Sequence, residues 1–196
     1  MSEAIDPEEV AALAHAARLF GDLFLFELDA GRLAALQAPE LRGALAALGV
    51  EVPNFDPAAP ESARALDELA AEFFAAVLSP TGGAPPVASL WQEGRYAGDV
   101  TARIADLAAL AGIDFDGIAA RAAPLDHLGC ILLLWGEAAE RAPVIADVIA
   151  LDHLAWAERP LARMAAGEGF YAALARASRE LVAALSATRL SGDSEG

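Results

Sequence analysis

Cysteine is scarce and lysine is absent in this 196-residue chain. There is a single cysteine, Cys130, which excludes an intramolecular disulfide and fits a reducing compartment. There is no lysine, so all 13 basic residues are arginine, against 29 acidic residues. The net charge of −16 argues against nucleic acid or an anionic membrane as a partner, because both require a basic surface. It is compatible with a cationic peptide partner, although many soluble proteins are acidic simply to stay in solution.

Long apolar runs and strand-forming residues are scarce as well. No uncharged stretch approaches the roughly 20 residues of a membrane span, and the acidic N-terminus is not a signal peptide. We therefore expect a cytoplasmic protein without stable membrane insertion. Hydrophobic residues make up 56% of the chain, but much of this is alanine, the best helix former. The composition predicts an all-α fold, a compact single-domain bundle of six to eight helices over residues 1–190, followed by a disordered tail at 191–196.

Helix signals divide the chain clearly. Asp6-Pro7-Glu8-Glu9 is a strong helix start, with an Asp N-cap, Pro at the first position and Glu at the third. Periodicity and capping residues predict further helices at 32–37, 39–48, 60–78, 99–111, 124–140, 143–156 and 170–190. Residues 79–98 are the longest irregular segment. A loop of that length inside a compact domain is usually functional or mobile.

An Asp-His pair precedes the most apolar of the predicted helices. Pro124 should start this helix, which places Asp126 and His127 in or near its first turn. One interpretation is structural, with Asp126 capping the turn and His127 at the boundary of the core. The other is functional, with a small polar patch that binds the backbone or the arginine side chains of a partner. Spacing alone favours the structural interpretation.

Catalytic and metal-binding patterns are weak in this sequence. His127 and Cys130 lie three residues apart on one predicted helix and could share a metal ion, but Cys130 is better explained as a small core residue. We find no nucleophile elbow, no zinc-protease motif and no phosphate-binding loop. The sequence therefore predicts no enzyme activity, no metal and no cofactor.

The aromatic residues fall into two groups. Phe73, Trp135 and Trp156 have helical spacing and are predicted to lie in the core. Trp91 follows a Pro-Pro turn in the 79–98 loop, and Phe74 lies beside the apolar stripe of its helix. We expect these two side chains to line a peptide-binding groove, since aromatic residues on a loop beside helices favour such a surface.

Three segments in order resemble the TorD/DmsD/NarJ family of redox-enzyme maturation chaperones, in particular its TorD/DmsD-like branch. They are Phe73–Pro80 continuing to Ser89-Leu90-Trp91, the segment Pro124-Leu125-Asp126-His127-Leu128-Gly129, and His153–Trp156 followed by Phe170–Ala175. The resemblance covers about residues 65–185. One departure is Ile131, because family members often carry an acid two residues after the glycine of the second segment.

The resemblance implies a dedicated cytoplasmic chaperone rather than an enzyme. Such a chaperone binds the twin-arginine leader, or its remnant, on the catalytic subunit of a molybdenum-cofactor oxidoreductase, and holds back the apoprotein until the cofactor is inserted. An arginine pair followed by an apolar stretch requires acids beside a hydrophobic groove. The predicted leader-binding residues are Phe74, Trp91, Pro124, Asp126 and His127. Replacing Asp126 with alanine should then weaken leader binding without loss of helicity.

Two other functions fit the same residues. One is a small-molecule or nucleotide-binding protein that uses the 79–98 loop as a lid, and the other is a general assembly or interaction module. The absence of any basic cluster near the loop counts against a phosphate ligand. The sequence leaves the client and the oligomeric state, monomer or dimer, open.

Overall fold

The computed structural model describes residues 6–59, 61–79, 83–114 and 123–191, and all of its regular elements are helical. The elements in chain order are α1 (Pro7–Leu25), α2 (Ala30–Leu36), α3 (Pro39–Ala47), α4 (Ser62–Phe73), the π-helical turn η1 (Phe74–Leu78), α5 (Ala88–Glu93), α6 (Asp99–Leu110), α8 (Leu128–Arg141), α9 (Pro143–His153), the 3₁₀ turn η2 (Ala155–Ala157), α10 (Glu158–Ala165) and α11 (Phe170–Ala187). The predicted all-α bundle is confirmed, but the described residues alone contain more α-helices than the six to eight predicted, because several of the helices are short.

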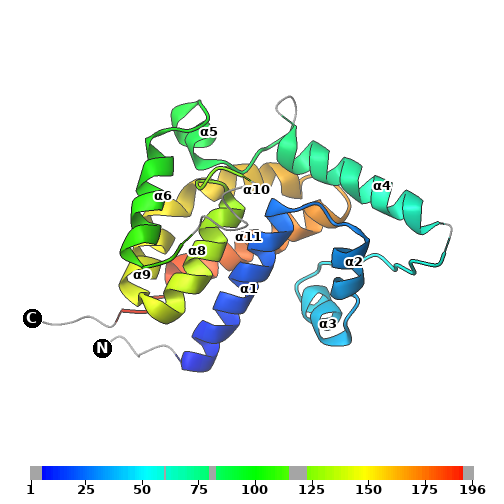
Figure 1. Ribbon diagram of the computed structural model, residues 1–196, viewed down its shortest axis with the longest axis horizontal. Coiled ribbons are helices and arrows are strands. Elements are labelled where there is room, and N and C mark those ends of the chain that lie inside the picture. The colour runs from blue at the N-terminus through cyan, green and yellow to red at the C-terminus, as the bar shows by residue number, and fades with distance from the viewer. Residues whose placement is uncertain (1–5, 60, 80–82, 115–122, 192–196) are drawn as a thin grey trace, which may run out of the picture.

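The centre of the bundle is the pair α1 and α8, which α9 and α11 flank (Figure 1). Glycine allows the two central helices to approach closely: a Cβ on Gly129 would lie 2.7 Å from the carbonyl oxygen of Gly21, and a Cβ on Gly21 would lie 2.7 Å from that of Gly129. At the edge of this contact Arg18 donates to Glu137 and Glu140, both at 2.8 Å. These partly exposed ion pairs add little stability beside the buried contact.

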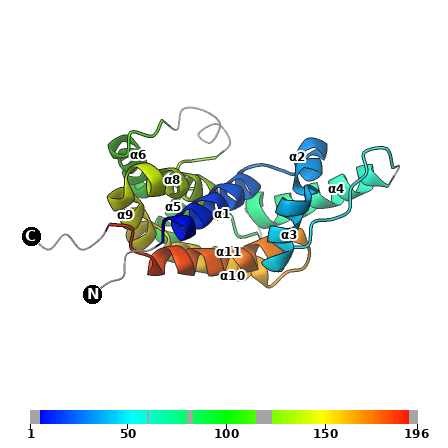
Figure 2. The same ribbon diagram turned by 90° about the horizontal axis from the view of Figure 1, so that it is seen from below.

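Helices α2, α3 and α4 lie at one end of the molecule, and α6 and α9 lie at the other (Figures 1 and 2). A carboxylate joins α4 to the bundle, because Glu72 accepts a hydrogen bond at 2.9 Å from the backbone N–H of Phe170, the first residue of α11. Gly169, just before that helix, has a φ of +90°, which favours glycine. The end of α4 is therefore fixed to the start of α11.

Several predicted boundaries are confirmed. Asp6 caps α1 by accepting from the backbone N–H of Glu8 at 2.9 Å, and α3 stops before Gly49, whose φ is +73°. Phe73, Trp135 and Trp156 are buried in the core, as predicted, and so is Cys130. Among the described residues no helix has the length and apolarity needed to cross a membrane.

Other boundaries differ from the prediction. The helix predicted over 60–78 ends at Phe73 and continues as the π-helical turn η1, and the segment 79–98 contains the helix α5. The helix predicted from Pro124 begins only at Leu128. Helix α10 was not predicted, because its short apolar pattern directly follows a 3₁₀ turn. The predicted tail lies outside the described residues except for Ser191.

Candidate functional site

A short segment, residues 84–89, connects three helical elements and is here named the strap. The N–H of Ala84 donates to the carbonyl of Ala76 in η1 at 3.3 Å, and the N–H of Leu128, at the start of α8, donates to the carbonyl of Pro86 at 2.7 Å. Val87 and His127 form an isolated antiparallel bridge. The strap thus passes between η1 and α8 before it enters α5, and its described part is fixed by main-chain hydrogen bonds. That arrangement does not favour a freely moving lid.

Asp126 is completely buried beside the strap. Its carboxylate accepts from the backbone N–H of Ser89 at 2.8 Å and from the hydroxyl of Thr101 at 2.9 Å, and its main-chain carbonyl accepts from the N–H of Ala88. The aspartate therefore caps α5 from another part of the chain and also holds α6. It does not cap α8, which the sequence suggested, and both of its carboxylate oxygens have partners inside the protein.

His127 is the N-cap of α8 instead. Its Nδ1 accepts from the backbone N–H of Gly129 at 3.1 Å, and its ring is almost fully buried. Burial lowers the pKa of His127 to about 4, although the neighbouring Asp126 opposes this shift. The imidazole is therefore neutral at pH 7, which its role as hydrogen-bond acceptor requires.

Trp91 lies on α5, half-buried, rather than in an irregular loop. Its indole Nε1 donates to the carbonyl of Pro85 in the strap at 2.7 Å. The guanidinium of Arg159, on α10, lies 5.4 Å from the centre of a Trp91 ring, a cation–π contact. The ring is held from two sides while part of it reaches the surface.

Phe74 and Pro124 are exposed. Phe74 begins η1, and 58% of its surface is accessible, next to a similarly exposed Leu78. A π-helical turn within a helix is often found at functional sites. Pro124 lies in the turn before α8, where its carbonyl accepts from the N–H of His127 at 2.9 Å. The five predicted residues therefore belong to elements that the strap connects, with three side chains at or near the surface and two buried beneath.

His127 and Cys130, the two residues of the metal site that the sequence raised, are both buried. Burial raises the pKa of the Cys130 thiol to about 12, and the charge of Asp126 adds to the effect. Within the ranges that the structure describes, no cluster of three or more His, Cys, Asp or Glu side chains is placed to hold a metal ion. Ile131, where family members often carry an acid, is fully buried in the core. An acid at this position would therefore face an apolar environment.

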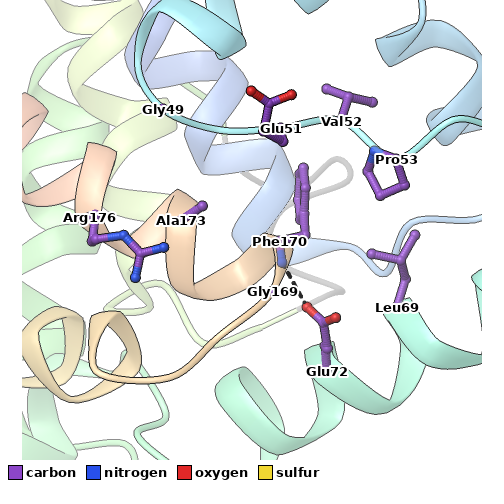
Figure 3. A pocket seen from close by; sticks show the side chains of 10 residues that line it. All are labelled: Gly49, Glu51, Val52, Pro53, Leu69, Glu72, Gly169, Phe170, Ala173 and Arg176. Atoms are coloured by element: carbon purple, nitrogen blue, oxygen red, sulfur yellow. Dashed lines mark hydrogen bonds between the residues drawn. The ribbon is translucent and has the colours of Figure 1, made fainter.

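Two cavities were not predicted from the sequence. The first, of about 460 Å³, lies between the segment after α3, helix α4 and the start of α11 (Figure 3). Its apolar lining includes Val52, Leu69 and Phe170. Three charged residues also line it: Glu51, Glu72 and Arg176. The second, of about 330 Å³, is a nearly wholly apolar groove between α1 and α3. Both depend on how distant helices meet, which local patterns do not reveal.

A family model described as "Nitrate reductase delta subunit" matches residues 33–157, more than half of the chain. The chain belongs to this family. It is the family of NarJ- and TorD-type chaperones, as the three sequence segments predicted. No significant match was found among curated proteins or among solved structures.

The match to the chaperone family extends from α2 to η2 and includes all five residues of the predicted site. It identifies a delta-type chaperone for the maturation of a molybdoenzyme, in a family of maturation chaperones rather than enzymes. The family also implies an interaction with a subunit of a molybdoenzyme of the nitrate reductase type. Helices α1, α10 and α11 lie wholly outside the matched residues, so the family match does not extend to them.

Proposed function

We propose that this chaperone acts in the cytoplasm and binds the N-terminal leader, or its remnant, of a molybdenum-oxidoreductase catalytic subunit before cofactor insertion. The observation that carries the proposal is the family match over residues 33–157. The charge supports it, because a chain with a net charge of −16 attracts a segment that contains an arginine pair.

The surface above the strap supports a peptide contact. Phe74 and Leu78 are large apolar side chains that are more than half exposed. Trp91 is half-buried, and its indole and the η1 backbone both form hydrogen bonds with the strap. We propose that Phe74, Trp91 and Pro124 touch the client. Asp126 and His127 then act as positioning residues, since they fix the strap and the start of α8 from inside.

The test is binding of a leader peptide, measured by titration calorimetry with the intact chain. Phe74→Ala is expected to weaken binding about tenfold, equivalent to about 1.4 kcal/mol, because a truncated aromatic contact typically costs that much. Leu110→Ala is the matched control, since Leu110 is even more exposed but lies at the end of α6. Absence of binding to the unaltered chain would contradict the proposal.

A second arm identifies the client. The tagged chain is used to capture proteins from its native host, and the same capture is repeated with a client that lacks its leader. A molybdenum-type catalytic subunit that is lost on deletion of the leader is the expected result. Capture that is independent of the leader would show that the chaperone recognises another part of its client.

A further inference from the structure

The groove between α1 and α3 is built from small side chains over an apolar floor. Ala12 and Ala16 lie one turn apart on α1 and leave space, while Phe20 and Leu45 are buried beneath them. The remaining lining residues are His15, Leu19, Leu41, Ala44 and Leu48. Leu48 is 44% exposed, so the apolar surface reaches solvent. Paired helices that enclose an open apolar groove form the usual receptor for an amphipathic helix.

The first turn of α1, at one end of this groove, is acidic. Glu8 lies four residues before Ala12 and therefore on the same face of α1, with Glu9 beside it, and both are exposed. Asp6 adds a third carboxylate at the same helix end. Together these charges outweigh the roughly half positive charge of the α1 N-terminus. Arg18, the one arginine of α1, is directed to Glu137 and Glu140 of α8.

We infer that the groove between α1 and α3 receives the apolar helical stretch of the client's leader, with the leader's arginine pair at the Glu8 and Glu9 end. The inference rests on the proposed function and names the surface that its apolar segment occupies. The argument is complementarity, because the leader and the groove share an order of features: charge at one end and a continuous apolar face beyond it. The leader would run parallel to α1. Leader residues outside the apolar stretch would then contact the surface formed by Phe74, Trp91 and Pro124.

The first experiment fills the groove. Ala12→Trp and Ala44→Trp, each at an exposed lining position, should weaken leader binding at least tenfold in titration calorimetry. Ala46→Trp is the matched control, because Ala46 is exposed on α3 two residues from Ala44, on roughly the opposite face, and does not line the groove. Circular dichroism and thermal unfolding of each variant show whether it is folded.

The second experiment removes charge. Glu8→Gln should weaken binding severalfold at low salt, with the difference shrinking as salt is raised, whereas the control Glu180→Gln on α11 removes the same charge without effect. A leader whose arginine pair is replaced by glutamine should lose this sensitivity to Glu8→Gln. That loss would assign the arginine pair to the acidic end of the groove.

The outcomes separate this inference from the proposed function. If the folded groove variants bind the leader as tightly as the unaltered chain while Phe74→Ala does not, the inference is overturned and the proposed function stands. If the unaltered chain binds no leader, both fail. If filling the groove changes only the oligomeric state in size-exclusion chromatography, the groove is a contact between copies of the chain, and the inference is overturned.

Discussion

Replacing Asp126 with alanine should destabilise the protein strongly, because its buried carboxylate connects three helices. It accepts from the N–H of Ser89 on α5 and the hydroxyl of Thr101 on α6, and its own backbone precedes α8. Hydrogen bonds to a charged group contribute about 1.5–3 kcal/mol each, and the substitution also leaves a buried N–H without an acceptor. We expect a loss of about 3–5 kcal/mol, a large share of the roughly 5–15 kcal/mol that stabilises a domain.

The assay is equilibrium unfolding in urea, followed by circular dichroism, with Thr101→Val as the comparison. That variant removes one of the two side-chain or backbone donors to the carboxylate and should lower the free energy of unfolding by about 1–2 kcal/mol. Valine has nearly the same shape as threonine, so the change chiefly removes the hydroxyl group. The double variant should lose less than the sum of the two, because Thr101 has no carboxylate to bond once Asp126 is gone. An Asp126→Ala chain with the unfolding midpoint of the unaltered protein would refute the reasoning.

The same variant separates the two interpretations of Asp126. If leader binding weakens in proportion to the loss of folded protein, the aspartate acts through the strap. If the variant remains stable but loses affinity for the leader, the carboxylate contacts the client directly, and the buried arrangement must open on binding. Unchanged affinity in a folded variant would leave Asp126 with its capping role alone.

Two further predictions concern α8 and the close helix contact. His127 has a folded pKa of about 4 and an unfolded value near 6.5, so the unfolded chain takes up a proton first as the pH falls. Unfolding free energy should therefore drop by about 2 kcal/mol from this group between pH 8 and pH 5, and His127→Asn, which keeps a capping acceptor, should remove that part of the pH dependence in urea titrations. Gly129→Ala should cost about 1–3 kcal/mol, since its Cβ would lie 2.6 Å from Leu25 Cγ and 2.7 Å from the Gly21 carbonyl. In the control Gly43→Ala no atom lies within 4 Å of the new Cβ, so this variant should be neutral or slightly stabilised; equal costs at the two positions would show that helix packing is not the cause.

The predicted site could be identified only in part from local sequence patterns. The sequence placed Phe74, Trp91, Pro124, Asp126 and His127 in one group through a family resemblance, and the strap now explains why they share elements. Whether they bind the leader stays a prediction. Spacing did not show which helix Asp126 would cap, because the capped N–H belongs to Ser89, 37 residues away. Only the packing of α5 against the start of α8 brings the two together.

The all-α fold, the first helix and the family could all be predicted from the amino-acid sequence alone. Alanine content and the Asp-Pro-Glu-Glu start act through local backbone preferences, which need no tertiary contact. Three features could not be predicted in this way: the start of α8 at Leu128, the helix α5 inside a segment rich in proline and glycine, and the groove between α1 and α3. These features depend on hydrogen bonds and packing between residues far apart in the chain. Local periodicity does not show which distant residues will be in contact.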